Sequence, residues 1–343
     1  MTKVYFISEA GLNHNGDLEI AKQLITVASL AGSNAVKFQK RCVDQMATKD
    51  ILDKEFTDYP SLGNTYREVR ENLELTHDEY KKIINYTHEM GIDFIVTPFD
   101  IQSVDFFNDL NVDGFKVAAH SLTDIPLLER LSIEDKPIFI STGMCRMEDI
   151  ELAVKTLNND GSRNKGKDKE LTVMHCVSQY PMNPKYANMT FINKLQKKFP
   201  NLRIGWSDHE DGILLTPVAV GMGATVIEKH ITVDKDLEGF DHKMSLNPEQ
   251  LIQCINNIRY VEKAIKYHNK IPMNNEMDCF NNYRRSIVAK VDINEGEKIT
   301  RDMITTKAPN VGIKPKYIHD LNGKTVNTNI KKDKHIKWND VNW

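Results

Sequence analysis

The chain has 343 residues, of which 40% are hydrophobic and 27% are charged, and its formal net charge is -3. This length fits either a barrel of about 250 residues with a small module or two ordinary domains. The charge balance lacks the basic excess of nucleic-acid-binding proteins, and no apolar run approaches the ~18 residues of a membrane span. We therefore expect neither nucleic acid nor a membrane as a partner.

Two features favour a cytoplasmic location. The five cysteines are scattered and lack C-x-x-C spacing, so neither a disulfide framework nor a zinc site is indicated. The apolar stretch 4–8 near the N-terminus is interrupted by Glu9 before it reaches the length of a signal-peptide core.

Eight short β-rich runs follow one another along the chain and are separated by helical stretches. They span residues 4–8, 35–39, 93–99, 114–119, 137–142, 171–177, 203–209 and 225–232. Between them, stretches such as 17–32 are amphipathic, and 76–91 opens with the capping-box pair Thr76 and Glu79. Nearly continuous apolar strands that alternate with helices are typical of a parallel sheet covered by helices.

Eight such units predict a (β/α)8 TIM barrel. The alternative is a doubly wound open sheet, which usually carries a glycine-rich phosphate loop after its first strand. Here the first strand leads instead to the sequence EAGLNHNG, so the barrel is favoured. We expect the barrel over residues 1–268, a linker over 269–283 and a small β-rich domain over 284–343. Residues 40–76 form a long connection of the kind that serves as a lid or binding loop.

Polar residues cluster where the predicted strands end. In barrels of this class, the carboxyl ends of the strands form the active-site face. We therefore expect one cavity mouth lined by Glu9, Lys37, Gln39, Thr97, Lys116, Ser141, His175, Ser178, Tyr180, Ser207, Asp208, His209, Glu228 and His230. A buried carboxylate such as Glu9 needs cations or substrate hydroxyls there to offset its desolvation.

Lys37 and Lys116 lie inside apolar strands, where an unpaired ammonium would cost several kcal/mol, roughly. Each lysine could pair with a buried carboxylate such as Glu9 or Glu228. The nearby hydroxyls of Ser141, Thr97 and Ser207 favour a phosphate or carboxylate ligand instead. A Schiff-base role for either lysine stays open.

His209 and His230 end neighbouring strands and could offer two neutral imidazoles to one divalent metal. Two histidines that bond each other are the alternative. The carboxylates Asp208, Glu228 and Asp241, which we expect in the same corner, favour the metal.

Several motifs, in order along nearly the whole chain, resemble the sialic acid synthase family, which comprises the N-acetylneuraminate, legionaminate and pseudaminate synthases. The matching stretches are SEAGLNHNGDLEIAKQLI, NAVKFQ, FIVTPFD, STGM, HCVSQYP, GWSDH, VIEKHIT, DHKMSLNPEQL and RRSIVAKVDINEGEKIT. The resemblance implies a barrel followed by an antifreeze-like (SAF) domain, and a homodimer in which this domain swaps over the partner's barrel.

The resemblance also implies a reaction, in which phosphoenolpyruvate condenses with the open-chain aldehyde of an N-acetylmannosamine-type sugar. The products are a nine-carbon 2-keto acid and phosphate. By resemblance, the phosphoenolpyruvate ligands are Lys37, Thr97, Lys116, Ser141, Ser178 and Ser207. His209 and His230 would hold Mn2+ or Mg2+, and the residues facing the sugar or the attacking water would be Glu9, Gln39, Tyr180, Glu228 and Asp241.

Three positions depart from the family pattern. Ala119 stands where a phosphate-binding serine is expected, Ser121 where a glutamate is expected, and Ala308 where an arginine usually reaches the partner's sugar site. These departures leave the identity of the sugar and the acyl contact open. The first alternative is the same chemistry on a legionaminate or pseudaminate precursor, and the second, from a different class, is a non-catalytic carbohydrate-binding barrel. The retained lysine and histidine pairs count against the second.

Overall fold

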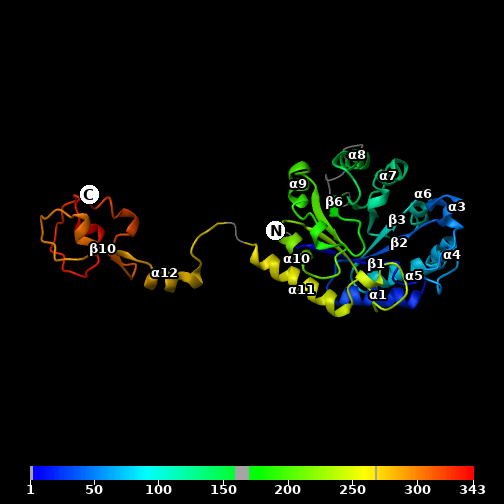
Figure 1. Ribbon diagram of the computed structural model, residues 1–343, viewed down its shortest axis with the longest axis horizontal. Coiled ribbons are helices and arrows are strands. Elements are labelled where there is room, and N and C mark those ends of the chain that lie inside the picture. Colours follow the sequence, from blue (N-terminus) through cyan, green and yellow to red (C-terminus); the bar gives the residue numbers. More distant parts are fainter. Residues whose placement is uncertain (1–2, 159–169, 267–268) are drawn as a thin grey trace. The chain divides into compact units, whose positions relative to one another are not determined.

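The structure is a computed structural model that describes residues 3–158, 170–266 and 269–343. The chain divides into two compact units, Met1–Tyr267 and His268–Trp343. In the first unit, helices surround a ring of strands (Figure 1). Among the described residues, no helix combines the length and apolar character that a membrane crossing requires.

Eight parallel strands close into a barrel in chain order, which confirms the predicted (β/α)8 fold. They are β1 (Tyr5–Gly11), β2 (Ala35–Lys40), β3 (Asp93–Pro98), β4 (Gly114–Val117), β5 (Ile138–Ser141), β6 (Leu171–Cys176), β7 (Arg203–Asp208) and β8 (Val226–His230). Each predicted run overlaps one strand. Several boundaries differ by one or two residues, and the largest difference is in the first strand, which does not stop at Glu9 but continues to Gly11, so this carboxylate lies within the strand.

The main helices of this unit are α1 (Leu18–Leu30), α5 (His77–Glu89), α6 (Ile101–Phe106), α7 (Ile125–Ser132), α8 (Met147–Leu157), α9 (Phe191–Lys198), α10 (Leu215–Gly221) and α11 (Pro248–Ala264). The side chain of Thr76 accepts a hydrogen bond from the Glu79 N–H, and the side chain of Glu79 accepts one from the Thr76 N–H. The predicted capping box is therefore present. The long connection after β2 contains three short helices, α2 (Val43–Met46), α3 (Lys49–Leu52) and α4 (Tyr66–Asn72). Short 3-10 helices include η1 (Ala119–Ser121), η3 (Pro184–Tyr186) and η4 (His242–Met244).

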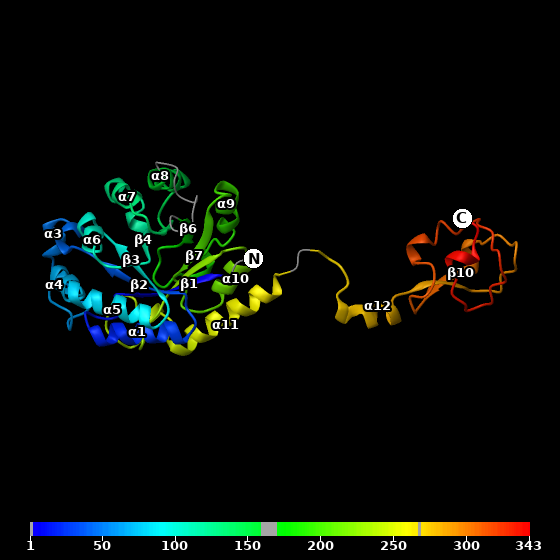
Figure 2. The same ribbon diagram turned by 180° about the vertical axis from the view of Figure 1, so that it is seen from behind.

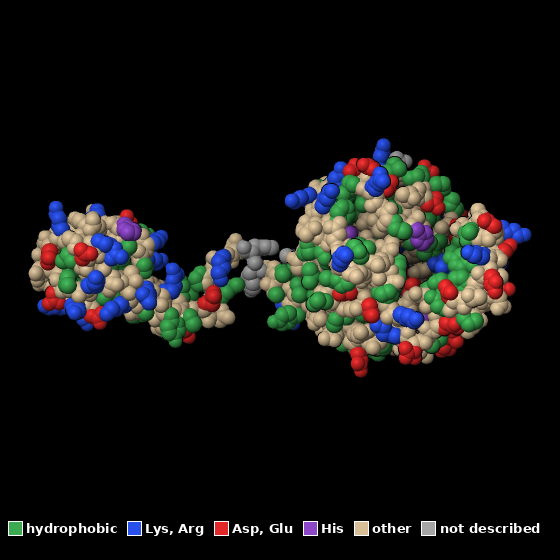
Figure 3. Space-filling model, viewed as in Figure 1, with side chains coloured by type: hydrophobic (Ala, Val, Ile, Leu, Met, Phe, Trp, Pro, Cys, Tyr) green, Lys and Arg blue, Asp and Glu red, His purple; other side chains and the backbone are tan. Residues whose placement is uncertain are grey.

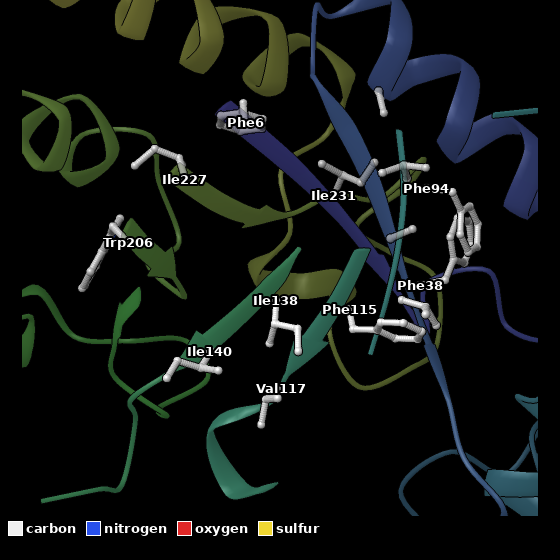
Figure 4. Close-up of a cluster of buried hydrophobic side chains, with 14 of the residues drawn as sticks. Phe6, Phe38, Phe94, Phe115, Val117, Ile138, Ile140, Trp206, Ile227 and Ile231 are labelled. Carbon is white, nitrogen blue, oxygen red and sulfur yellow. The ribbon is translucent and has the colours of Figure 1, made fainter. Parts of the chain in front are cut away.

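The larger core lies between the strands and the surrounding helices. Phe6 of β1, Phe38 of β2 and Trp206 of β7 are fully buried in it, and Figure 4 shows them with their neighbours. Burial of an aromatic or branched side chain contributes roughly 1.5–3 kcal/mol, so this layer supplies most of the barrel's hydrophobic stabilisation.

The inside of the barrel is built in two layers. Successive side chains of a strand point to opposite faces, so residues two apart share a face. The lower layer is apolar or lacks a side chain: Ile7, Ala35, Ile95, Gly114, Phe139, Met174, Gly205 and Val226. Two residues further along each strand come Glu9, Lys37, Thr97, Lys116, Ser141, Cys176, Ser207 and Glu228. The apolar layer closes the barrel beneath, and the polar layer forms the floor of a site above it.

The second unit has its own core, formed by Ile287, Ala289, Ile293, Ile299, Ile304, Ile313, Leu321, Val326, Ile330, Ile336 and Val341. Its strands β9 (Ser286–Ala289) and β10 (Ile304–Lys307) are antiparallel, with Ile304 opposite Ala289. Helix α12 (Met277–Tyr283), seen from behind in Figure 2, lies within the stretch expected as a linker. Further 3-10 helices are η5 (Asn274–Glu276), η6 (Arg301–Met303), η7 (Pro315–Tyr317) and η8 (Trp338–Asp340).

Candidate active site

A cavity of about 420 Å³ opens at the carboxyl ends of the barrel strands. It is lined by Glu9, Lys37, Gln39, Thr97, Lys116, Ser141, Ser178, Tyr180, Ser207, His209, Glu228, His230 and Asp241, among others. The hollow in this unit, with histidine side chains at its edge, is visible in Figure 3. All the residues to which the family resemblance gave a binding, catalytic or metal role therefore meet in one cavity.

Strand register brings the charged groups together. In the sheet, β1 lies between β2 and β8, and Glu9 is the register partner of Lys37 on one side and of His230 on the other. Ser207 of β7 is likewise opposite Glu228 of β8. Glu9 and His230, which are 221 positions apart in the chain, thus become neighbours because the barrel closes between its first and last strands.

The floor of the cavity is a network of two ammonium groups, two carboxylates and several hydroxyls. Lys37 Nζ lies 2.9 Å from Glu9 Oε2 and donates to Thr97 Oγ1 at 2.8 Å. Lys116 Nζ donates to Ser141 Oγ at 2.6 Å and lies 3.5 Å from Glu228 Oε2. All four charged side chains are at most 5% exposed. The alternative in which buried carboxylates pair with the lysines is therefore present.

Glu228 sits between the two cations and stays ionised. Burial alone would raise its pKa, but the positive charges of Lys116 and Lys37 outweigh this and hold the pKa at about 2. Its Oε1 also accepts a hydrogen bond from Ser207 Oγ at 3.2 Å. Burial lowers the pKa of Lys116, although Glu228 opposes that change.

Glu9 has the opposite tendency. Burial raises the pKa of this carboxyl above its ordinary value, against the opposing charge of Lys37. Gln39 Nε2 donates to its Oε1 at 2.7 Å. Two carboxyls in one site whose pKa values are pushed apart are suited to different roles, and Glu9 is the one suited to carry a proton.

The rings of His209 and His230 lie next to each other at the cavity surface, with their centroids 5.4 Å apart. His209 Nδ1 lies 2.8 Å from the carbonyl oxygen of Val177. Because a carbonyl only accepts, Nδ1 carries a hydrogen, and in the neutral ring Nε2 therefore has the lone pair, as in most metal-binding histidines. Burial would lower the pKa of His209, but Cys176 and the Val177 carbonyl raise it above its ordinary value.

His230 is suited to the same role. Burial lowers its pKa to about 4, so the ring is neutral at pH 7. Its buried Nδ1 has no hydrogen-bond partner and lies 3.7 Å from Asp241 Oδ2. Within the described ranges, no three His, Cys, Asp or Glu side chains come close enough together to form a metal site by themselves. The pair fits a divalent ion whose remaining ligands are substrate or water.

Comparison with known families agrees with this geometry. Residues 24–270 match the NeuB family, and residues 284–342 match the SAF domain. The chain belongs to the NeuB family. The small second unit of this NeuB protein is accordingly the SAF domain that the sequence motifs indicated.

Two relatives of this NeuB chain carry synthase names. It is 37% identical to the N-acetylneuraminate-9-phosphate synthase of Mus musculus, over 96% of this chain and 90% of the relative. It is 36% identical to the N,N'-diacetyllegionaminic acid synthase of Campylobacter jejuni, over 98% of this chain and all of the relative. The chain is also similar to the sialic acid synthetase from Leptospira borgpetersenii, whose crystal structure superposes with a TM-score of 0.71. The two sequences are 30% identical, and the match covers 81% of this chain and 90% of that one.

Two residues expected at the mouth lie elsewhere. His175 points to the outer face of the barrel, where its Nε2 bonds the Ala187 carbonyl at 2.9 Å beside Trp206. Asp208 also faces outward and pairs with Lys229 at 2.9 Å, both side chains being at most 1% exposed. The expectation that Asp208 joins the metal corner was therefore wrong. Both residues precede an inward-facing neighbour, and strand alternation turns them away.

The buried Asp208–Lys229 pair gives a stability prediction for this NeuB protein. Asp208 Oδ2 also accepts from Thr216 Oγ1 at 2.7 Å. Lys229→Met should lower the free energy of unfolding by about 3–5 kcal/mol, because it leaves a buried carboxylate without its cation. Urea unfolding measures this.

The matched control is Lys235→Met, which breaks a more exposed pair with Asp211 at 2.9 Å. It should cost at most about 1 kcal/mol. Adding Asp208→Asn to Lys229→Met should recover part of the loss. Equal losses for the two lysine variants would contradict the assignment.

Further residues that sequence reasoning did not select line the same cavity, among them Arg41, Arg70, Phe99, Cys176 and Phe240. Arg70 comes from helix α4 in the long connection that was expected to serve as a lid or binding loop. At the departure positions, Ala119 lines the cavity, whereas Ser121 is buried and lies outside the lining. The charged residues of a long loop resemble solvated surface residues, so the sequence held no signal that selected them.

Proposed function

We propose that this chain is a phosphoenolpyruvate-dependent synthase that acts on an N-acylated amino sugar of the N-acetylmannosamine type. It joins the two into a nine-carbon 2-keto acid and releases phosphate. The observation that carries the proposal is the juxtaposition, in one cavity, of the lysine and hydroxyl floor with the His209–His230 pair. The floor suits a small, highly charged anion, and the histidines suit the ion that would activate an aldehyde.

Phosphoenolpyruvate binds, in this proposal, over the two lysines. Lys116 and Ser141 are already 2.6 Å apart, so an incoming phosphate oxygen meets an ammonium and a hydroxyl together. The buried Oγ of Ser178 has no hydrogen-bond partner, and a Cβ at Gly143 would lie only 2.2 Å from it. The absence of that Cβ leaves room for the Ser178 hydroxyl itself, which is then free to donate to the phosphate. Lys37, Thr97 and Ser207 complete the set of donors.

The sugar lies on the opposite side of the floor, toward Gln39, Tyr180 and Asp241. A divalent ion held by His209 and His230, Mn2+ or Mg2+, would supply Lewis-acid polarisation of the aldehyde oxygen. Carbon 3 of phosphoenolpyruvate bonds to the aldehyde carbon, and water then adds to carbon 2. The bond between carbon 2 and the phosphate oxygen then breaks, the new hydroxyl becomes the keto oxygen, and its proton leaves with the phosphate. Glu9 gives a proton to the aldehyde oxygen and takes one back from the attacking water. Glu228, which stays ionised, stabilises the positive charge that develops at carbon 2.

The acceptor is the finer part of the proposal. The same chemistry on a legionaminate or pseudaminate precursor is the second candidate, because one relative carries a diacetyllegionaminic acid synthase name and another an N-acetylneuraminate-9-phosphate synthase name. Ala308 follows β10 and is exposed, so this chain offers no guanidinium at that place for the acyl group. A cytoplasmic, domain-swapped homodimer belongs to the same proposal and is supported by the SAF domain and by five free cysteines.

Phosphate release tests the function. The protein is mixed with phosphoenolpyruvate, Mn2+ and a panel of N-acylated amino sugars, and phosphate is measured over time. We expect release only when phosphoenolpyruvate and an acceptor are both present, and we expect EDTA to stop it. Release without any acceptor would make the protein a phosphatase. If no acceptor leads to phosphate release, a non-catalytic carbohydrate-binding barrel is favoured instead. Full activity in EDTA would show that no metal is required.

A further inference from the structure

The turn that follows β1 has the sequence NHNG, and neither of its two asparagines lines the cavity. Asn13 is nevertheless only 1% exposed, and a buried amide needs hydrogen-bond partners. Asn15 has a φ of 49°, a left-handed backbone that is uncommon outside glycine. Both asparagines find their partners on the chain segment that follows β8.

This segment leaves the barrel and returns to it at the same place. The Leu246 N–H donates to the His230 carbonyl at 2.8 Å, and the Thr232 N–H donates to the Leu246 carbonyl at 2.9 Å. Residues 233–245 therefore form a loop that is closed at its base. Within this loop, Asp241 lines the cavity and lies 3.7 Å from His230. Closing the base does not by itself fix the position of Asp241.

Asn13 connects the end of β1 to the main chain of Asp241. Its Nδ2 donates both to the Ile231 carbonyl and to Ser245 Oγ, each at 2.8 Å. Ser245 Oγ in turn donates to the Asp241 carbonyl at 2.6 Å. The buried hydroxyl of Ser245 therefore passes the position of Asn13 on to the backbone of Asp241.

Asn15 holds the same loop on both sides of Asp241. Its Nδ2 donates to the Glu238 carbonyl at 2.9 Å, so its Oδ1 faces His242 and accepts from Nε2 of that ring at 3.3 Å. The packing here is close, because a Cβ at Gly239 would lie 2.8 Å from the His242 ring and 3.2 Å from Asn15 Oδ1. The loop is therefore clamped just before and just after Asp241.

We propose that Asn13 and Asn15 are positioning residues that hold Asp241 where it meets the acceptor, and that they set the affinity for the acceptor without touching it. A side chain that binds a substrate must be held to within about 0.5 Å by its surroundings. The inference rests on the proposed function, in which Asp241 faces the amino sugar. Phosphoenolpyruvate should not sense either asparagine, because Lys116 and Ser141, which lie on β4 and β5, are among its ligands.

Asn15→Gly is the first test, because glycine tolerates the left-handed backbone and the variant loses only the amide. Phosphate release by the full-length protein is measured with Mn2+, phosphoenolpyruvate and the most active sugar of the panel. We expect the KM for the sugar to rise about tenfold, the effect of one or two hydrogen bonds, while the KM for phosphoenolpyruvate stays within about twofold. Asn13→Ala, which removes both hydrogen bonds of the buried amide, should act in the same direction.

A double-mutant cycle separates positioning from a general loss of stability. Asp241→Ala should raise the KM for the sugar by itself. Adding Asn15→Gly to it should change that KM by less than about twofold, because the asparagine acts through the carboxylate that is already gone. Effects of the two changes that simply multiply, or a KM for phosphoenolpyruvate that rises as much as that for the sugar, would overturn the inference.

Asn193→Ala is the matched control, because Asn193 is also half-buried and its Nδ2 also donates to a backbone carbonyl, that of Met222, but it lies on α9. It should leave both KM values unchanged. If the parent protein releases no phosphate with any sugar, the proposed function fails, and calorimetric titration with N-acetylmannosamine decides the positioning role separately. Binding that Asn15→Gly weakens in the parent but not in Asp241→Ala supports the role. Absence of binding, or equal weakening in both backgrounds, overturns it.

Discussion

Replacing His209 by alanine should lower kcat by about a thousandfold, which corresponds to roughly 4 kcal/mol of transition-state stabilisation. The imidazole contributes a ligand lone pair that the Val177 carbonyl orients, and alanine removes it without disturbing the apolar layers of the barrel. Binding of Mn2+ by the variant, followed by electron paramagnetic resonance, should be at least tenfold weaker. Unfolding by urea should occur near the parental midpoint.

His77→Ala is the control for this prediction, since His77 lies on α5 and contacts Asp109 at the surface at 3.4 Å. It should leave Mn2+ affinity and turnover as they are in the parent. A His209→Ala variant that binds Mn2+ as tightly as the parent would show that the histidine pair is not a metal site.

Replacing Lys116 by methionine should weaken phosphoenolpyruvate binding by about tenfold to a hundredfold, because a charge-assisted hydrogen bond contributes roughly 1.5–3 kcal/mol. The variant also removes one of the two cations beside Glu228. The negative charge of Glu228 is then less neutralised and repels the incoming anion more strongly. Isothermal titration with phosphoenolpyruvate measures the effect. The affinity for the sugar should change little.

Ser141→Ala refines this test. Ser141 accepts from Lys116 at 2.6 Å and carries no charge, so its loss should weaken phosphoenolpyruvate binding less than the loss of the lysine does. Lys235→Met, which touches only a surface carboxylate, should have no effect. Unchanged phosphoenolpyruvate affinity in Lys116→Met would remove this lysine from the site.

The barrel and most of its floor could be predicted from the sequence because a closed parallel barrel imposes one simple rule. Most of the strands are apolar over much of their length, and an inward-facing polar residue stands out near the carboxyl end. Glu9, Lys37, Lys116 and Glu228 were found in this way, and each lies two residues beyond an inward-facing residue of the lower layer.

The errors came from applying that rule without the alternation of faces. Asp208 and His175 stand among polar residues at strand ends, yet each is one position out of phase with the inward-facing residues. Cys176, which is in phase, lines the cavity and was not selected, because a cysteine in an apolar run resembles a core residue. Arg70 could not be found at all, since its position depends on how a long connection folds back onto Phe240.

The central claim is that the cavity forms a carbon–carbon bond between phosphoenolpyruvate and the acceptor aldehyde. Nuclear magnetic resonance with phosphoenolpyruvate labelled with carbon-13 at carbon 3 tests it most directly, in the presence of Mn2+ and the preferred amino sugar. The proposed reaction predicts that the label appears in a methylene group coupled to the former aldehyde carbon, with one phosphate released for each product molecule. Label found in the methyl group of pyruvate, with the sugar unchanged, would contradict it.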